Sequence, residues 1–122
     1  MTTVKSYRDL IVWQKSIALT KKIYAFTQPF PKEEIYGLTS QMRRASVSIA
    51  CNIAEGQARN STGEFIQFLG ISRGSLAELE TLLLLSKEMN FLKEENYQIL
   101  SADCEEISKL LNALIKSLST RH

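Results

Sequence analysis

The chain has 122 residues, of which 44% are hydrophobic and 23% are charged, with five glycines and two prolines. This composition excludes a disordered or collagen-like chain, and the length suits one domain around one core. No apolar run approaches the roughly 18 residues of a membrane span, and the N-terminus lacks the apolar segment of a secretory signal. We therefore expect a cytoplasmic protein without a membrane partner. The formal charge is +2, and Lys and Arg exceed Asp and Glu in the N-terminal half, which permits an anionic partner.

The first predicted helix spans residues 7–26, with Ser6 as its N-cap. Helical spacing places Leu10, Trp13, Ile17 and Tyr24 on one face, which we expect to be the core face. A second apolar group lies beside the basic residues of the far side and comprises Ile11, Val12, Leu19 and Ile23. One stripe suffices for a lone bundle, so the second group predicts contact with another chain.

The second predicted helix spans residues 31–55, since Pro31 is compatible with a first helical turn and Gly56 is a natural C-terminal stop. One apolar stripe runs along it at alternating spacings of three and four, which predicts a buried face made of Ile35, Leu38, Met42, Ala45, Ile49 and Ile53.

The third predicted helix spans residues 62–89 and begins with a capping box made by Ser61 and Glu64. Its main stripe comprises Phe65, Phe68, Leu69, Ser72, Leu76, Leu79 and Leu83. Small residues lie opposite, and glycine inside a helix costs roughly 1 kcal/mol relative to alanine, so a close helix contact should offset that cost. We predict that contact, with another helix of the bundle or with a second subunit, at Gly70, Gly74, Ala77 and Thr81.

The fourth predicted helix spans residues 94–118, after a left-handed cap at Asn90 that returns Phe91 to the core. An unbroken heptad seam runs along this helix through Tyr97, Leu100, Cys104, Ile107, Leu111, Leu114 and Leu118. Four amphipathic helices joined by short connections predict an all-α, antiparallel up-down-up-down four-helix bundle as one domain over residues 1–122.

The sequence holds no recognisable catalytic or metal motif. His122 is the only histidine, which argues against a di-iron bundle, a zinc site or a nucleophile with a histidine base. No phosphate-binding or dinucleotide-binding glycine loop occurs, so no cofactor is predicted. Cys51 and Cys104 are isolated within helical patterns, which is typical of buried thiols in a reducing compartment. We predict a protein that is not an enzyme.

Polar residues of the second helix allow two interpretations. Arg43, Arg44, Asn52 and Glu55 could make hydrogen bonds and ion pairs between helices, with Glu78 or Glu80 as partners. Alternatively, the two arginines and Arg59 could bind phosphates, to which guanidinium groups are well suited. A further basic surface for nucleic-acid backbone is built from Lys5, Arg8, Lys15, Lys21, Lys22 and Arg59.

A family resemblance rests on one run of residues around the second helix: Tyr36, Gln41, Arg43, Arg44, Ala45, Ser48, Ile49, Asn52, Ile53, Glu55 and Gly56. Trp13, Glu78 and Glu80 extend this motif on either side. The chain resembles the four-helix-bundle proteins encoded in intervening sequences of 23S ribosomal RNA genes. The resemblance implies a ring of five identical subunits, in which the motif residues Trp13, Tyr36, Gln41, Ser48, Asn52, Glu55, Gly56, Glu78 and Glu80 are structural. It also implies kinship with the accessory variability protein of diversity-generating retroelements, which associates with a reverse transcriptase and with nucleic acid.

Two functions from different classes therefore stand as expectations. The first is a homopentameric bundle that binds RNA or another nucleic acid through the basic residues of its N-terminal half. The second is a protein-interaction scaffold that docks a partner enzyme such as a reverse transcriptase and makes no direct nucleic-acid contact.

Overall fold

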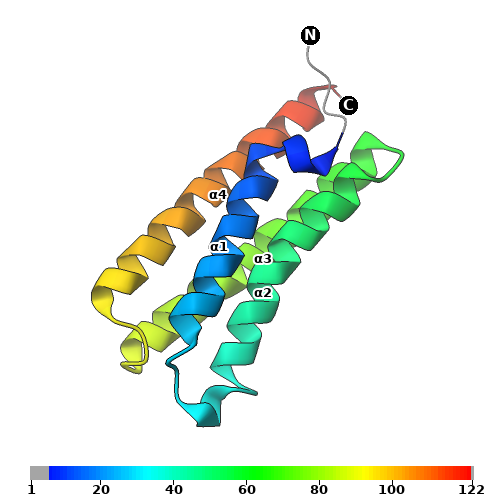
Figure 1. Cartoon of the computed structure of the whole chain (residues 1–122). Helices are drawn as coiled ribbons and strands as arrows, with labels where there is room; N and C mark the ends of the chain where they lie inside the picture. The colour runs from blue at the N-terminus through cyan, green and yellow to red at the C-terminus, as the bar shows by residue number, and fades with distance from the viewer. Residues whose placement is uncertain (1–5, 122) are drawn as a thin grey trace.

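Four long helices pack in chain order in the computed structural model, which describes residues 6–121. These helices are α1 (Ile11–Thr27), α2 (Leu38–Gln57), α3 (Thr62–Glu88) and α4 (Glu94–Arg121), with short 3₁₀ turns η1 (Tyr7–Asp9) and η2 (Lys32–Glu34) before α1 and α2. Successive helices run in opposite directions, and α1 also packs against α4 (Figure 1). The predicted all-α four-helix architecture is confirmed within the described residues. No helix in this part of the chain is both long and apolar enough to span a membrane.

The first helix is broken near its start, contrary to the predicted span of 7–26. Ser6 caps η1, because its Oγ accepts a hydrogen bond of 3.1 Å from the Arg8 backbone N–H. Leu10 is then extended, with φ −77° and ψ 124°, and α1 begins at Ile11. This break folds η1 back so that the Tyr7 ring meets Trp13 edge-on at 5.2 Å between centroids. The aromatic contact secures a turn that helical periodicity alone does not predict.

The predicted core face of α1 is correct only at its start, where Leu10 and Trp13 are partly buried against the core. Val12, Leu19 and Ile23 are buried, whereas Ile17 and Tyr24 keep 38% and 45% of their surface exposed. The helix carries two apolar stripes of similar strength, so the spacing did not decide between them. The core-facing stripe also contains two hydroxyl residues, which make it less apolar along its length. Both are satisfied by backbone carbonyls one turn earlier: Ser16 donates to Val12 and Thr27 donates to Ile23.

The second helix begins seven residues later than predicted, at Leu38 instead of residue 31. The chain first makes η2 and then passes through Gly37, whose φ of −109° and ψ of −115° lie outside the helical region. Glu34 bridges the gap, since its Oε1 accepts a hydrogen bond of 3.2 Å from the Leu38 N–H. Tyr36 is therefore held outside the helix, with 93% of its surface exposed.

The ends of α3 confirm the predicted capping residues. The Glu64 N–H donates to Ser61 Oγ at 3.1 Å, and the Ser61 hydroxyl donates to Glu64 Oε1 at 3.2 Å. Asn90 takes the predicted left-handed conformation, with φ 65°. The chain then returns to the core, where the Phe91 ring packs 6.0 Å from that of Phe30.

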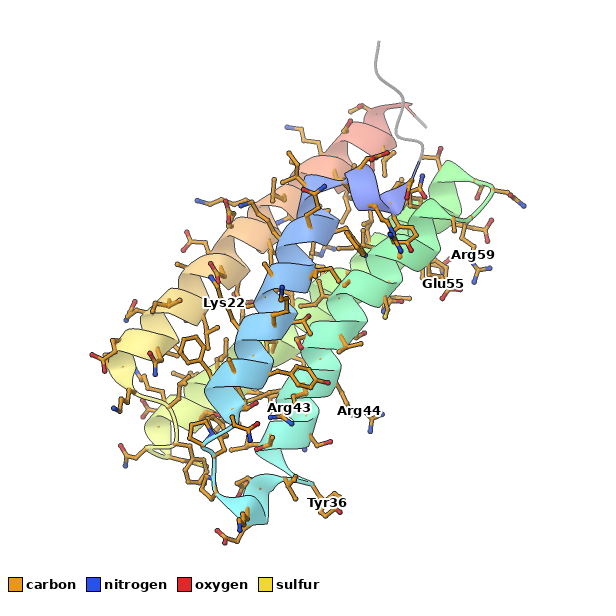
Figure 2. All side chains as sticks on the ribbon, in the orientation of Figure 1. Lys22, Tyr36, Arg43, Arg44, Glu55 and Arg59 are labelled. Carbon is orange, nitrogen blue, oxygen red and sulfur yellow. The ribbon has the colours of Figure 1, made fainter. Side chains whose placement is uncertain are left out.

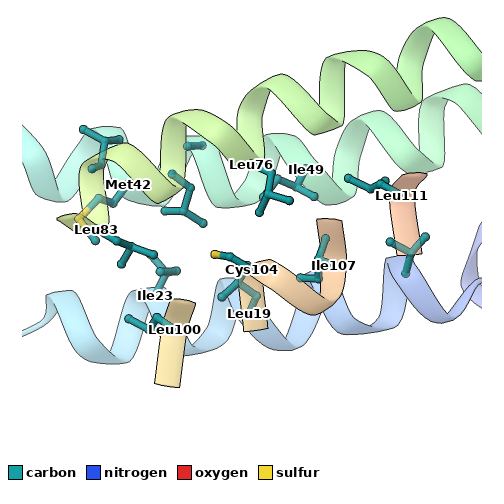
Figure 3. Packing of buried hydrophobic residues seen from close by; sticks show 14 of the residues in the cluster. Leu19, Ile23, Met42, Ile49, Leu76, Leu83, Leu100, Cys104, Ile107 and Leu111 are labelled. Carbon is teal, nitrogen blue, oxygen red and sulfur yellow. The ribbon is translucent and has the colours of Figure 1, made fainter. Parts of the chain in front are cut away.

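The core contains one apolar layer from each helix (Figure 3). Most of the predicted stripe of α2 is confirmed, although Ile35 is exposed and Leu38 is only partly buried. The seams of α3 and α4 are confirmed at their central positions. The largest fully buried side chains are Leu19, Ile23, Met42, Ile49, Ile53, Leu69, Leu76, Leu79, Leu83, Leu100, Ile107 and Leu111.

The two cysteines differ in environment, although burial was predicted for both. Cys51 is exposed on α2, whereas Cys104 is fully buried on α4. Burial, together with the charges of Glu80 and Asp103, raises the pKa of the Cys104 thiol from 9.0 to about 12.

We expect one thiol per folded chain to react with a disulfide reagent at pH 8, and two in denaturant, because attack requires an accessible thiolate. The unfolded chain releases the Cys104 proton near pH 9 and the folded chain only near pH 12. The free energy of unfolding should therefore fall as the pH rises between these values, by up to about 1.4 kcal/mol per pH unit from this group. A Cys104→Ala variant is the control for both measurements. Equal native reactivity of the two thiols at pH 8 contradicts the assignment.

Candidate nucleic-acid and assembly surfaces

Arg43 is bound to the end of α1. Its Nε donates to Thr27 Oγ1 at 3.0 Å, and its Nη2 donates to the Tyr24 carbonyl at 3.4 Å. The guanidinium carbon also lies 4.6 Å from the centroid of the Tyr24 ring. These contacts satisfy a carbonyl of the last turn of α1 and place a cation where the helix dipole favours one. Arg43 therefore links two helices, but its partners are not the predicted Glu78 and Glu80.

Arg44 is the adjacent residue and has a different environment. Its side chain is exposed, and within residues 6–121 it forms no hydrogen bond or ion pair. Figure 2 shows Arg44 and Tyr36 projecting from the same side of the molecule, away from α1. Both line an open hollow of about 480 Å³ between α2 and α3, together with Ser40, Gln41, Ala45, Ser48 and Glu78.

A second hollow, of about 390 Å³, lies on the other side of Arg44. Its lining is mostly apolar and includes Tyr24, Val47, Ser48, Cys51 and Asn52. No binding role was predicted for Tyr24 or Ser40. The spacing of four residues from Ser40 to Arg44 and on to Ser48 could have identified this exposed stripe of α2.

The predicted basic surface is interleaved with acids. Lys15 pairs with Glu106 at 3.3 Å, and Lys22 pairs with Asp103 at 2.7 Å, so α4 neutralises two of the three lysines of α1. Exposed pairs of this kind contribute at most about 1 kcal/mol each to stability, but they reduce the positive potential that attracts phosphates. Replacing Lys22 with Glu would also place its carboxylate beside that of Asp103.

The remaining predicted basic residues are scattered. Arg8 lies over the Tyr7 ring at 5.9 Å, and Lys21 is exposed on α1. Lys5, like His122, lies outside the described residues. The structure thus does not gather the predicted lysines into one uninterrupted patch.

Arg59 is held at the turn between α2 and α3. Its Nη2 lies 2.7 Å from Glu55 Oε2 and its Nη1 lies 3.8 Å from Glu64 Oε2. The guanidinium also stacks 4.8 Å from the centroid of Phe68. These contacts occupy the guanidinium N–H groups that a phosphate would need. Arg59 therefore connects α2 to α3 at the turn between them (Figure 2).

Other motif residues form a polar seam between α2 and α3. The hydroxyls of Ser48 and Ser75 are 2.8 Å apart, and the Asn52 amide donates to the Ser48 carbonyl and hydroxyl at 2.9 and 3.0 Å. Nearby, the Ser72 hydroxyl donates to the Ile49 carbonyl at 2.9 Å. Ser48 and Asn52 are thus engaged in hydrogen bonds within the bundle, whereas Gln41 and Glu80 are exposed.

Gly56 lies inside α2 and is not its C-terminal stop. A Cβ at this position would lie 2.7 Å from the Phe68 Cβ and 3.3 Å from the Phe65 carbonyl oxygen. The glycine therefore permits the close approach of α3 just before the turn. The helix continues to Gln57, so this use of glycine differs from the predicted one.

The small residues of α3 are uncovered within the described chain. A Cβ at Gly70 or Gly74 would meet no atom within 4 Å, and Ala77 and Thr81 are exposed. Large apolar side chains lie on the outer surface of the same helix: Ile71, Leu84 and Leu85 are 47%, 44% and 45% exposed. No helix of the bundle makes the close contact predicted here.

Among residues 6–121, no three His, Cys, Asp or Glu side chains cluster in a way that could hold a metal ion. Exposed guanidinium, phenol and carboxylate groups suit binding by ion pairing, stacking and hydrogen bonds.

The fold and the α2 motif together define a helical-bundle protein with a polar α2–α3 seam. The chain belongs to the 23S rRNA-intervening sequence protein family, whose profile matches residues 8–113. This match confirms the resemblance found in the sequence.

Among solved structures, the chain is similar to a crystal structure of a protein of unknown function from the S23 ribosomal protein family of Bacteroides thetaiotaomicron VPI-5482. The two are 29% identical, with a TM-score of 0.79, over 87% of this chain and 99% of that chain. A search of curated proteins finds no match.

Proposed function

We propose that this protein is a non-enzymatic, homo-oligomeric four-helix bundle that binds RNA or another nucleic acid at the exposed stripe of α2. One observation supports this proposal most directly: the Arg44 guanidinium has no protein partner within residues 6–121 and lies between two hollows that each contain an exposed tyrosine. A cation for phosphate beside aromatic rings for bases is the arrangement that single-stranded nucleic acids require. This assignment moves the centre of the proposed site from the lysines of α1 to Arg44.

Self-association is supported by the outer surface of α3. Gly70 and Gly74 each cost roughly 1 kcal/mol relative to alanine, and no contact within the described chain offsets that cost. A helix of a second copy could approach closely over Gly70, Gly74, Ala77 and Thr81 and cover the exposed leucines. Repetition of one such heterologous contact closes into a ring, which we propose to be a pentamer as the family resemblance implies.

The second candidate is a scaffold that docks a partner enzyme, such as a reverse transcriptase, without touching nucleic acid. The ion pairs of Lys15, Lys22 and Arg59 favour it, because protein carboxylates already neutralise three of the proposed phosphate ligands. In this case Arg44 and Tyr36 would contact protein.

Light scattering across a size-exclusion peak, at low and high salt and with or without a mixed RNA pool, distinguishes these functions. We expect a mass near five chains that co-elutes with RNA only at low salt. Arg44→Glu should keep the mass and lose the RNA, whereas Lys116→Glu on the exposed surface of α4 makes the same charge change and should retain most binding.

Each other outcome contradicts a defined part of the proposal. A ring that retains no RNA at either salt favours the scaffold. A monomer refutes self-association through α3. Equal loss of RNA in the two charge variants shows that net charge, not the α2 stripe, governs binding.

A further inference from the structure

The hollow between α2 and α3 brings three different functional groups to one opening. Tyr36 offers a ring that is 93% exposed, Arg44 offers a guanidinium, and Glu78 offers a carboxylate from the neighbouring helix. Within residues 6–121 none of the three side chains forms a hydrogen bond or an ion pair. Ser40 and Gln41 add further polar groups at the rim.

The dimensions of the hollow suit one nucleotide. Its volume of about 480 Å³ lies within the range of roughly 300–1,000 Å³ found for small-molecule sites. The ring of Tyr36 is held outside the helix by the turn at Gly37, so both of its faces are available for stacking. A flat polar ligand with an attached anion fits this combination better than an apolar one.

We propose that this hollow binds an unpaired guanine of single-stranded RNA, an inference that rests on the nucleic-acid binding proposed above. The guanine stacks on Tyr36, its Watson–Crick edge meets the Glu78 carboxylate, and the adjoining phosphate pairs with Arg44. Unpaired bases are the usual targets of sequence-specific RNA binding, because their faces and edges are both accessible.

The carboxylate of Glu78 determines which base is preferred. An ionised carboxylate only accepts hydrogen bonds. Guanine presents two adjacent donors, N1–H and the N2 amino group, which match the two carboxylate oxygens. Adenine and cytosine each place an acceptor nitrogen beside their amino group, and uracil has one N–H between two carbonyls. Only guanine therefore makes two hydrogen bonds with this group and avoids repulsion.

Changing Glu78 to glutamine should abolish the preference. The amide offers one acceptor and one donor, and this pair matches the amino group and ring nitrogen of adenine or cytosine and the N–H and carbonyl of guanine or uracil. Titration of the folded protein with GMP, AMP, CMP or UMP, followed by NMR, measures the four affinities. We expect the native protein to favour GMP by about fivefold or more, E78Q to lose that preference, and Y36A to weaken all four. The matched control is E80Q, which removes a nearby exposed charge of α3 and should leave the order unchanged.

Parallel measurements with single-stranded oligoribonucleotides that contain or lack guanine separate this inference from the function on which it rests. RNA retention without a base preference, or the same response in E78Q and E80Q, overturns the guanine assignment and leaves RNA binding intact. Selectivity for GMP without retention of any oligonucleotide overturns the proposed RNA function and keeps the base site. Equal or absent binding of the four nucleotides overturns the base site. All three variants alter exposed side chains, and circular dichroism verifies that they fold.

Discussion

In the monomeric chain, replacing Leu83 with alanine should lower the free energy of unfolding by about 2–5 kcal/mol, whereas the same change at Leu84 should alter it by about 0.5 kcal/mol or less. The two residues are neighbours on α3 with the same chemistry and helix propensity. Leu83 is completely buried in the core layer that contains Met42 and Ile23 (Figure 3), and Leu84 is 44% exposed. Deleting the buried side chain leaves a cavity in close-packed surroundings, and solvent fills the space left at the surface.

Urea unfolding followed by circular dichroism measures this difference, at a protein concentration where light scattering gives the mass of one chain for both variants. A larger loss for Leu84→Ala at concentrations where the protein is assembled would show that a second chain covers Leu84. That result would support assembly through the outer surface of α3. Equal, small losses at both positions would contradict the packing described for α3.

The sequence predicted the fold well because each helix carries a strong local signal. The stripe of α2 and the seam of α4 each have one dominant apolar period, and Ser61 and Asn90 are residues whose chemistry specifies helix ends. Such signals depend only on neighbouring residues in the sequence, so they can be recognised without knowing which helices pack together. The family motif around α2 strengthened the same conclusion.

Prediction failed where two arrangements had similar local support. In α1, the stripe that includes Ile17 is as apolar as the one that includes Leu19, and only packing against α2 and α4 selects the second. The break at Leu10 has the same origin, because it depends on the Tyr7–Trp13 contact.

Arg44 is the only residue of the candidate hollow that the sequence predicted to bind a ligand, since Tyr36 and Glu78 were predicted to be structural. Arg43 and Arg44 are adjacent in sequence, yet α1 binds one and leaves the other exposed. Glu78 and Tyr36 were recognised as motif residues, but their place beside one hollow depends on the register of α3 against α2. Long-range geometry of this kind has no counterpart in spacing along the chain.

Glycine substitutions give the second large effect, with opposite signs at Gly56 and Gly74. Gly56→Ala should lower the free energy of unfolding by about 1–3 kcal/mol, since its new Cβ would lie 2.7 Å from the Phe68 Cβ and force α2 and α3 apart. In the monomeric chain, Gly74→Ala should raise it by up to about 1 kcal/mol, because alanine favours the helix and its Cβ meets no atom within 4 Å in the described chain. In the proposed ring the same change should instead weaken assembly, because a second copy packs over Gly74.

Urea unfolding of the two variants tests this contrast, and light scattering on the same samples reports assembly. Because the two changes add the same methyl group within a helix, helix propensity alone would stabilise both, so any difference in sign comes from the space around each glycine. Stabilisation of both variants would contradict the close approach of α3 at Gly56. Destabilisation at Gly74 together with a lower mass would instead mean that a neighbouring subunit approaches that glycine, as the proposed ring requires. Both glycines would then be explained by the close approach of another helix. That helix belongs to the same chain at Gly56 and to a neighbouring subunit at Gly74.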